Sequence, residues 1–430
     1  MADSGTHAHP WLRSLSVYCD RRLMLILAQG FSSGLPYLLT FGTLTAWMSQ
    51  EGVAKTLIGF MTWSSSVYAL KFLWAPVVDQ LPIPILTKLM GQRRSWMLLS
   101  QVMCAVSIVG LSLTNPGVNL ALTAVWAVAL ASSSATQDIV IDAYRIEYLK
   151  QSESGAGAAM TTVGYRGGVL VAGGGALILA DSFGWTFSYM TMAVFVAVGV
   201  ITTFLSPEPI RPVALGPKAG YAAWIKTAVV DPFLEFLTRP GAIGILAFIM
   251  LYKYGDALWA PMANPFYLET GFTLTQVGVV IKTYGVVMTI VGSFVGGAMV
   301  ARYGIHRTLF WGSLSMGLSN LLLAALAAIG PSLPALTVVI SVENFANGIG
   351  GVALIAFLSS ICNFAFTATQ YALMTSFMAF TRTILASGGG WLADQMNWVM
   401  FFIVTTFAAI PGFLLLLWMM RRFPEQRESA

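Results

Sequence analysis

Long apolar runs dominate the pattern of hydrophobic and polar positions along this chain. Twelve runs are each close to the roughly 20 residues that a helix needs to cross the hydrocarbon core of a bilayer. The alternation at about ten-residue spacing that is typical of a membrane β-barrel is absent. The pattern therefore predicts twelve transmembrane helices, over residues 23–48, 56–76, 95–113, 119–144, 157–180, 185–205, 241–268, 275–300, 307–329, 334–360, 368–392 and 397–420.

The composition of the chain also indicates a membrane protein. Hydrophobic residues make up 57% of the 430 positions and charged residues only 10%, whereas soluble domains carry about 25% charged residues. The mean hydropathy is +0.75. Because the twelve runs leave no stretch long enough for a separate soluble domain, we expect an all-α integral membrane protein.

The placement of basic residues predicts the orientation of the chain. If the N-terminus is cytoplasmic, 16 of the 23 Lys and Arg residues fall in inner segments and only Lys55 falls in an outer loop. Cytoplasmic loops carry such an excess, so we expect both termini to be cytoplasmic. The net charge of +5 then reflects topology and contact with anionic membrane lipids, not nucleic-acid binding. The six remaining basic residues lie within spans: Lys71, Arg145, Arg166, Lys253, Lys282 and Arg382.

The longest polar connection divides the chain into two groups of six spans. Residues 1–22 form an N-terminal tail, 23–205 a first six-helix bundle, 206–240 a cytoplasmic linker, 241–420 a second bundle and 421–430 a C-terminal tail. Four prolines between positions 207 and 217 prevent a continuous helix through the linker. The linker stretch YAAWIKTAVVDPFLEFL fits either a short amphipathic helix in the membrane interface or an ordered connection without a functional contact.

The two groups of spans resemble each other weakly. The second span of each group contains one Lys, the fourth contains acids, and the fifth contains one Arg followed by a run of three glycines. Parallel six-helix repeats with polar residues at their interface are the pattern of the major facilitator fold. We therefore expect that fold, with two six-helix bundles related by pseudo-two-fold symmetry.

The connection between the second and third spans resembles the gating loop of major facilitators. Asp79 stands at the end of the second span, and Arg93 and Arg94 precede the third. In that superfamily an acid and basic residues at these positions latch the inner gate. The insertion between Asp79 and Gly91 departs from the compact signature. Two interpretations therefore stay open: a latch, or two arginines that only anchor a helix end on the positive side.

The fourth span carries many charges for a membrane helix, in the stretch SATQDIVIDAYRIE. Asp138, Asp142 and Arg145 are spaced by four and three residues, so they share a face that should point to protein or water. Asp142 and Arg145 fit an intrahelical ion pair near the inner surface, and we expect Glu147 to be solvated. Asp138 lies deeper, where burial and a nearby Arg166 would compete over its charge, as suits a residue that loads and releases a proton.

The second half offers matching polar groups. Lys253 and Asp256 are three residues apart in the seventh span and fit either an intrahelical ion pair or a binding site. The stretch ISVENFANG places a carboxylate and two amides on one side of the tenth span. Arg166 and Arg382 either neutralise buried acids or hold a substrate carboxylate through forked hydrogen bonds. The candidates for proton coupling are Asp138, Asp142, Asp256 and Glu343, and those for substrate binding are Gln137, Arg166, Lys253, Lys282, Asn344, Asn347 and Arg382.

The sequence contains no catalytic constellation. It has no Walker loop, no HExxH motif and no Ser–His pair at usable positions. The three cysteines are scattered and the three histidines lack ligand spacing, so we expect no disulfide framework, no metal site and no cofactor. The chain is therefore expected to be a transporter that uses an ion gradient or the gradient of its substrate, not an enzyme.

Specific motifs resemble the AmpG-type anhydromuropeptide permeases, a family of major facilitators. They are QGFSSGLPYLLTFGTLTAWM, KFLWAPVVD, SATQDIVIDAYRIE, GAGAAMTTVGYRGG, LYKYGDA, VENFANGIGG and NFAFTATQYAL, which follow one another in the order of the family. The resemblance implies a monomeric permease of the bacterial inner membrane that imports GlcNAc–1,6-anhydro-MurNAc and its peptides for peptidoglycan recycling. It also implies uptake driven by the proton gradient, and an influence on β-lactamase induction in some bacteria.

Two other functions stay open from the residues. A related facilitator would import another large polar solute, such as a siderophore chelate, because such facilitators share the QD-containing fourth span. A membrane-embedded sensor or lipid-modifying enzyme is a different class, which needs a soluble sensing domain or a reactive constellation near one interface. With the resemblance added, we expect a proton-coupled muropeptide importer whose halves rock around a site near the midplane of the membrane.

Overall fold

The computed structural model describes residues 17–61, 66–210, 226, 230–384 and 388–423. Within these ranges the chain forms helices and no strand. Ten helical stretches are long and apolar enough to cross a membrane, and they correspond to ten of the twelve predicted spans. The two other predicted spans, 56–76 and 368–392, each include residues outside the described ranges and contain shorter helices.

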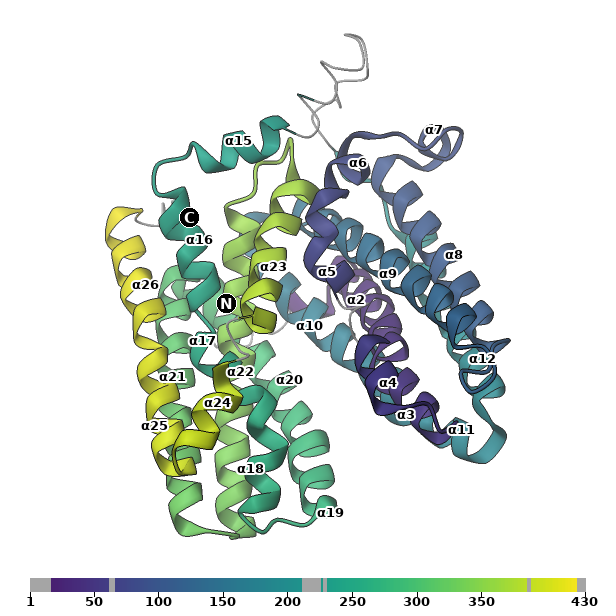
Figure 1. The fold of residues 1–430 in the computed structure, drawn as a ribbon. Coiled ribbons are helices and arrows are strands. Elements are labelled where there is room, and N and C mark those ends of the chain that lie inside the picture. The colour runs from purple at the N-terminus through teal and green to yellow at the C-terminus, as the bar shows by residue number, and fades with distance from the viewer. Residues whose placement is uncertain (1–16, 62–65, 211–225, 227–229, 385–387, 424–430) are drawn as a thin grey trace, which may run out of the picture.

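The first half of the molecule runs from the purple to the blue-green part of Figure 1. Its helices are η1 (Val17–Cys19), α2 (Arg21–Thr40), α3 (Gly42–Gln50), α4 (Lys55–Met61), α5 (Ser66–Leu70), η3 (Lys71–Leu73), α6 (Ala75–Gln80), α7 (Leu86–Met90), α8 (Gln92–Ser112), α9 (Leu120–Tyr148), η4 (Gln151–Glu153), α10 (Ser154–Leu170), η5 (Val171–Gly175), α11 (Ala176–Phe183), α12 (Trp185–Phe195) and α13 (Ala197–Leu205).

The second half runs from the teal to the yellow part of Figure 1. After the linker helix α15 (Asp231–Leu237), its helices are α16 (Ala242–Leu251), α17 (Tyr254–Trp259), η7 (Ala260–Met262), α18 (Ala263–Glu269), α19 (Leu274–Gln276), η8 (Val277–Tyr284), α20 (Gly285–Tyr303), α21 (Ile305–Ile329), α22 (Leu333–Ser360), α23 (Thr367–Ile384), α24 (Gly388–Gln395), α25 (Trp398–Ala408) and α26 (Ile410–Arg422).

The fourth span is longer than the apolar pattern predicted. Asn119 caps its N-terminus, because the Asn119 side chain accepts a hydrogen bond from the backbone N–H of Leu122 at 3.0 Å. From there α9 continues to Tyr148 rather than ending at residue 144. Arg145 and Glu147 therefore lie on the same helix as Asp138 and Asp142.

Glycines bring α2 and α10 into direct backbone contact. A Cβ atom on Gly34 would lie 2.2 Å from the carbonyl oxygen of Tyr165, and one on Gly164 would lie 2.0 Å from that of Leu27. Real Cβ atoms do not approach a carbonyl oxygen so closely, so a larger residue at either position would push the two helices apart. The first and fifth spans are in this way packed as a single unit.

The two halves meet along a seam formed by spans that correspond to each other in the repeat. In the first half the seam is made by α5, η3, α6, α9 and α10, and in the second half by α20, α22 and α23. Figure 1 shows the halves joined near α6 and α23 and diverging toward α3 and α4 on one side and α18 and α19 on the other. The joined end also carries the linker helix α15.

The linker helix α15 packs on the second half. Gln370 of α23 donates a hydrogen bond to Glu235 of α15, and Arg239 binds Glu235 at 2.7 Å and the carbonyl of Ile361 at 2.6 Å. Phe236 is fully buried. The end of the predicted amphipathic stretch thus forms a short helix held by protein contacts, and most of the stretch before it lies outside the described residues.

Candidate functional site

In the first half, two carboxylates of α9 face basic residues of the same half. The Ser33 hydroxyl of α2 donates a hydrogen bond to Asp138 Oδ1 at 2.5 Å. The ammonium group of Lys71, which is only 7% exposed, attracts both Asp138 and Asp142. The sequence suggested Arg166 as the cation beside Asp138, whereas in the structure Lys71 of η3 has this role.

Arg145 belongs to the same group of charged residues and also contacts the other half. We call Lys71, Asp138, Asp142 and Arg145 the first-half cluster. Its guanidinium lies 3.3 Å from Asp142, so the intrahelical ion pair expected from the three-residue spacing is confirmed. The same guanidinium donates a hydrogen bond to the Tyr371 hydroxyl of α23 at 3.0 Å and lies 5.4 Å from the centre of the Tyr371 ring. Arg145 therefore joins the halves at the seam.

Gln137, which the sequence predicted to bind substrate, is buried in the structure. It is 1% exposed. Its amide donates to the Ser32 hydroxyl at 2.7 Å, and its carbonyl accepts from the Cys104 thiol at 3.4 Å. These partners lie on α2 and α8, so Gln137 holds three helices of the first half together in this conformation.

The second half gathers its polar groups around Asn347 of α22. The Asn347 amide donates to Glu343 Oε1 at 2.9 Å and to Asp256 Oδ2 at 3.3 Å, while its carbonyl accepts from Lys253 Nζ at 2.8 Å. Asn344 donates to the other oxygen of Glu343 at 2.6 Å. One amide thus links two carboxylates and one ammonium group, and we call Lys253, Asp256, Glu343, Asn344 and Asn347 the second-half cluster.

The seventh span is interrupted at this cluster. The chain leaves helical geometry at Lys253, between α16 and α17, with φ −113° and ψ 22°. Gly255 sits just beyond the break, where a Cβ atom would lie 2.6 Å from the carbonyl oxygen of Thr405. Interrupted membrane helices place backbone groups and side chains at binding sites near the midplane. The break therefore supports a binding site at Lys253 and Asp256.

Arg166 of α10, in the opposite half, acts on the second-half cluster through its charge. Its guanidinium attracts Glu343, which is 8% exposed. Lys253 attracts both Asp256 and Glu343. The two carboxylates of the cluster therefore face two cations, of which one belongs to the other half.

The two remaining substrate-binding candidates are placed differently. Lys282 lies on η8 with an exposed side chain. Arg382 belongs to the backbone of α23, but its side chain lies outside the described residues.

The gating-loop residues form a buried charge network at the joined end of the halves. The Arg93 guanidinium is fully buried and lies 2.6 Å from both Asp79 and Glu147. Asp79 also accepts hydrogen bonds at 3.1 Å from the backbone N–H and the hydroxyl of Thr369, at the start of α23 in the other half. Asp79 thus links Arg93 to the other half despite the insertion, part of which forms the short helix α7. The expectation that Glu147 is solvated was wrong, because α9 continues past residue 144 and turns this carboxylate toward Arg93.

Arg94 differs from Arg93 in its partners. Its guanidinium donates to the backbone carbonyls of Thr203 at 3.1 Å and Phe204 at 3.2 Å and remains partly exposed. Glu208 caps the N-terminus of α8 by accepting hydrogen bonds from the backbone N–H groups of Arg93 and Arg94, at 2.8 and 3.1 Å. Burial raises the pKa of the Glu208 carboxyl, against the lowering effect of these hydrogen bonds.

Two contact residues were missed at the sequence level. Thr369 and Tyr371 lie in the stretch NFAFTATQYAL, which entered only through its family resemblance. Both touch charged residues more than 200 positions earlier in the chain. No local spacing indicates such contacts, although polar residues at the start of an apolar span were a signal that could have been followed.

The chain is similar to known transport proteins over nearly its whole length. A family model described as "Major Facilitator Superfamily" matches residues 25–264 and 249–430. The "Anhydromuropeptide permease" of Escherichia coli K12 is 38% identical over 405 residues, which cover 94% of this chain and 80% of that relative. The "Putative transporter AmpG 4" of Rickettsia conorii is 32% identical over 416 residues, covering 95% of this chain and 99% of the relative.

Solved structures show the same fold at low sequence identity. The proton:xylose symporter XylE aligns with a TM-score of 0.70 and 14% identity over 96% of each chain. The human organic anion transporter MFSD10 aligns with a TM-score of 0.67 and 16% identity, over 95% of this chain and all of that chain. The expected two-bundle facilitator fold is thereby confirmed.

Proposed function

Because the chain belongs to the major facilitator superfamily and, within it, to the AmpG-type anhydromuropeptide permeases, we propose that it imports anhydromuropeptides. The substrates are GlcNAc–1,6-anhydro-MurNAc and its peptides, carried across the bacterial inner membrane into the cytoplasm. The family is one of permeases rather than enzymes. We further propose a monomer with both termini in the cytoplasm.

The observation that carries this proposal is the second-half cluster with Arg166 beside it. An anhydromuropeptide carries hydroxyls, acetamides and carboxylates. Asn344 and Asn347 suit the hydroxyls and acetamides, and Arg166 and the exposed Lys282 suit the carboxylates. The interrupted seventh span places Lys253 among these groups. These residues come from both halves, as alternating access around a central site requires.

The proton and the substrate are proposed to compete for the same charges. Arg166 and Lys253 are the two cations that attract the Glu343 carboxylate. A substrate carboxylate that draws Arg166 away leaves Glu343 with a weaker positive environment, and the carboxylate then binds a proton more readily. Substrate and proton are thus taken up together. Asp256 shares Lys253 and Asn347 with Glu343 and is the second candidate in this cluster, while Asp138 and Asp142 are the candidates of the first half.

Release into the cytoplasm needs the joined end to open. The contacts to be broken are those from Asp79 to Thr369 and from Arg145 to Tyr371. Asp79 keeps Arg93 as a partner after the halves separate, and Arg145 keeps Asp142. Neither buried charge is left alone in the open state, so the opening avoids the large cost of an unpaired buried ion.

Transport by the purified protein in proteoliposomes tests the proposal. Labelled GlcNAc–anhydro-MurNAc tripeptide is offered with and without an inward proton gradient, beside a ferric siderophore chelate as a comparison solute. We expect accumulation of the muropeptide that depends on the gradient. Uptake of the chelate with no uptake of the muropeptide, in protein shown to be folded, would refute the substrate. Equal muropeptide uptake with and without the gradient would refute proton coupling alone.

A further inference from the structure

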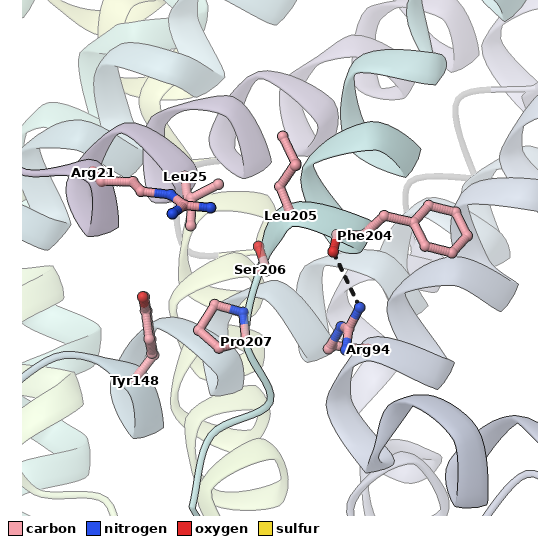
Figure 2. A pocket seen from close by; sticks show the side chains of 8 residues that line it. All are labelled: Arg21, Leu25, Arg94, Tyr148, Phe204, Leu205, Ser206 and Pro207. Carbon is pink, nitrogen blue, oxygen red and sulfur yellow. Dashed lines mark hydrogen bonds between the residues drawn. The ribbon is translucent and has the colours of Figure 1, made fainter.

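A pocket of about 370 Å³ lies within the first half, at the end of the molecule where the halves are joined. It is bounded by the start of α2, the start of α8, the end of α9, and the end of α13 with the chain just after it. Figure 2 shows Arg21 and Tyr148 on one side of this pocket and Arg94 on the other, with Ser206 and Pro207 between them. None of these residues belongs to the second-half cluster or to the seam.

The pocket has an excess of positive charge. Two guanidinium groups line it, those of Arg21 and Arg94. The carboxylates nearby are engaged elsewhere: Asp20 and Glu153 bind Arg22 at 3.0 and 2.7 Å, and Glu208 caps α8. Arg21 has an exposed side chain and forms no ion pair within the described part of the chain. An anion that enters the pocket therefore meets two basic groups whose charge is not already neutralised there.

Arg94 is held in place for such a contact. Its two hydrogen bonds to the carbonyls of Thr203 and Phe204 fix the orientation of the guanidinium. The hydroxyl of Tyr148 adds a further donor on the opposite wall. Forked guanidinium groups and a hydroxyl are the donors that bind phosphate oxygens well.

Exposed apolar side chains line one side of the pocket. Phe204 and Leu205, at the end of the sixth span, are 57% and 55% exposed. Leu25 contributes a further apolar wall. A free phosphate ion makes no favourable contact with these apolar side chains, whereas the acyl chains of a phospholipid would cover them. The pocket also lies at the ends of membrane-spanning helices, and such ends are expected to meet the headgroup region of a bilayer.

We propose that this pocket binds the phosphate headgroup of an anionic phospholipid from the leaflet on the linker side, which the distribution of basic residues predicts to be cytoplasmic. Basic pockets between membrane helices on that side are suited to anionic headgroups. The bound lipid contacts four spans of one half and none of the other. It therefore stabilises the inner end of the first half as a unit while leaving the seam free to open. The site is independent of the transported solute.

Native mass spectrometry of the purified full chain in detergent tests this site. The probe is dioleoylphosphatidylglycerol, with dioleoylphosphatidylcholine and inorganic phosphate as comparison ligands. We expect tighter binding of phosphatidylglycerol than of phosphatidylcholine. Arg21→Gln should weaken phosphatidylglycerol binding about five-fold, the loss expected for one basic contact near an anionic surface. Arg21→Lys, which keeps the charge, should bind nearly as well as the unchanged protein.

The matched control is Arg421→Gln. Arg421 is an exposed basic residue in the last turn of α26, outside the pocket, and its replacement removes the same charge from the protein. We expect it to leave phosphatidylglycerol binding unchanged. Equal weakening by Arg21→Gln and Arg421→Gln, or equal binding of the two phospholipids, overturns the site. Displacement of phosphatidylglycerol by inorganic phosphate at similar concentration overturns the lipid assignment in favour of a free anion. Because no muropeptide is present, the outcome does not depend on the transported substrate.

Discussion

Each half of the molecule places two carboxylates opposite two cations, but the halves obtain their cations differently. In the first half, Lys71 and Arg145 both come from the same half as Asp138 and Asp142. In the second half, Lys253 is local whereas Arg166 comes from the first half. The first cluster can therefore remain electrically balanced when the halves move apart, and the second cannot.

This difference suggests a division of labour between the clusters. A cluster that carries its own cations suits a constant structural role, because conformational change leaves its charges paired. A cluster that depends on a cation of the other half changes its charge balance whenever the two halves move relative to each other. Such a cluster suits the coupling of proton binding to that movement. We therefore expect Glu343 to be more important for coupling than Asp138.

Replacing Glu343 is expected to have the largest effect. In Glu343→Gln the side chain keeps its size but cannot ionise, so proton-driven uptake should fall by about 10- to 100-fold, the usual range of coupling between sites. Exchange of labelled for unlabelled muropeptide without a gradient should continue. Asp138→Asn, the matched change in the first-half cluster, should retain most of the gradient-driven uptake. Loss of gradient dependence in Asp138→Asn alone would reverse the assignment of the clusters.

Removing the shared cation should have the next largest effect. Arg166→Gln should raise the KM for muropeptide uptake about tenfold, because a hydrogen bond to a charged group contributes roughly 1.5–3 kcal/mol. The matched change is Lys71→Gln in the first half, for which we expect lower thermal stability and a smaller change in KM. Initial rates over a range of substrate concentrations and unfolding scans of both variants measure the two effects. A larger KM change in Lys71→Gln would contradict the proposed position of the substrate.

The contact between Arg145 and Tyr371 can be tested with native cysteines. Tyr371→Phe removes a hydrogen bond to a charged group, which contributes roughly 1.5–3 kcal/mol, and keeps the ring beside the guanidinium, so the joined end should open about ten times more often or more. Cys362 is buried near this contact, Cys104 is buried within the first half, and Cys19 is exposed. Alkylation followed by mass spectrometry should show faster modification of Cys362 only.

In that experiment Cys19 and Cys104 serve as internal controls. Faster modification of Cys104 as well would indicate general unfolding, which would contradict a specific role of Tyr371 at the seam. An unchanged rate at Cys362 would show that the hydrogen bond does not limit opening.

The smallest effect is expected for Ser33→Ala. The variant removes the hydroxyl that donates to the Asp138 carboxyl group, which should lower stability by roughly 1.5 kcal/mol and leave gradient-driven uptake nearly intact. Thermal unfolding and proteoliposome uptake measure the two quantities. A loss of coupling in this variant would show that the first-half cluster handles the proton after all.

The sequence was sufficient for the architecture because the membrane requires it. A helix that crosses lipid must be apolar over a fixed length, so hydrophobic runs indicate spans directly. Spacing within one helix was equally informative, since it predicted the pair of Asp142 and Arg145. The end of α9 was misplaced, because Glu147 was expected to be solvated, whereas its contact with Arg93 buries it.

Contacts between distant spans could not be read from local patterns. Gln137 looked like a ligand because it adjoins Asp138, but a neighbour in sequence points about 100° away on a helix and here faces α2 and α8. Arg166 was expected beside Asp138 but attracts Glu343 of the other half, and no spacing within one helix indicates such a contact. Thr369 and Tyr371 become visible only once the halves are assembled.

The glycine contact between α2 and α10 has a mechanical consequence. The absence of side chains at Gly34 and Gly164 lets the two helix backbones touch, so we expect the two helices to move as one body. Arg166 lies two residues beyond Gly164, so its position is fixed relative to the rest of the first half. A small rotation of that body moves the guanidinium relative to Glu343 without any helix bending. The angle between the halves would in this way determine when Glu343 exchanges its proton.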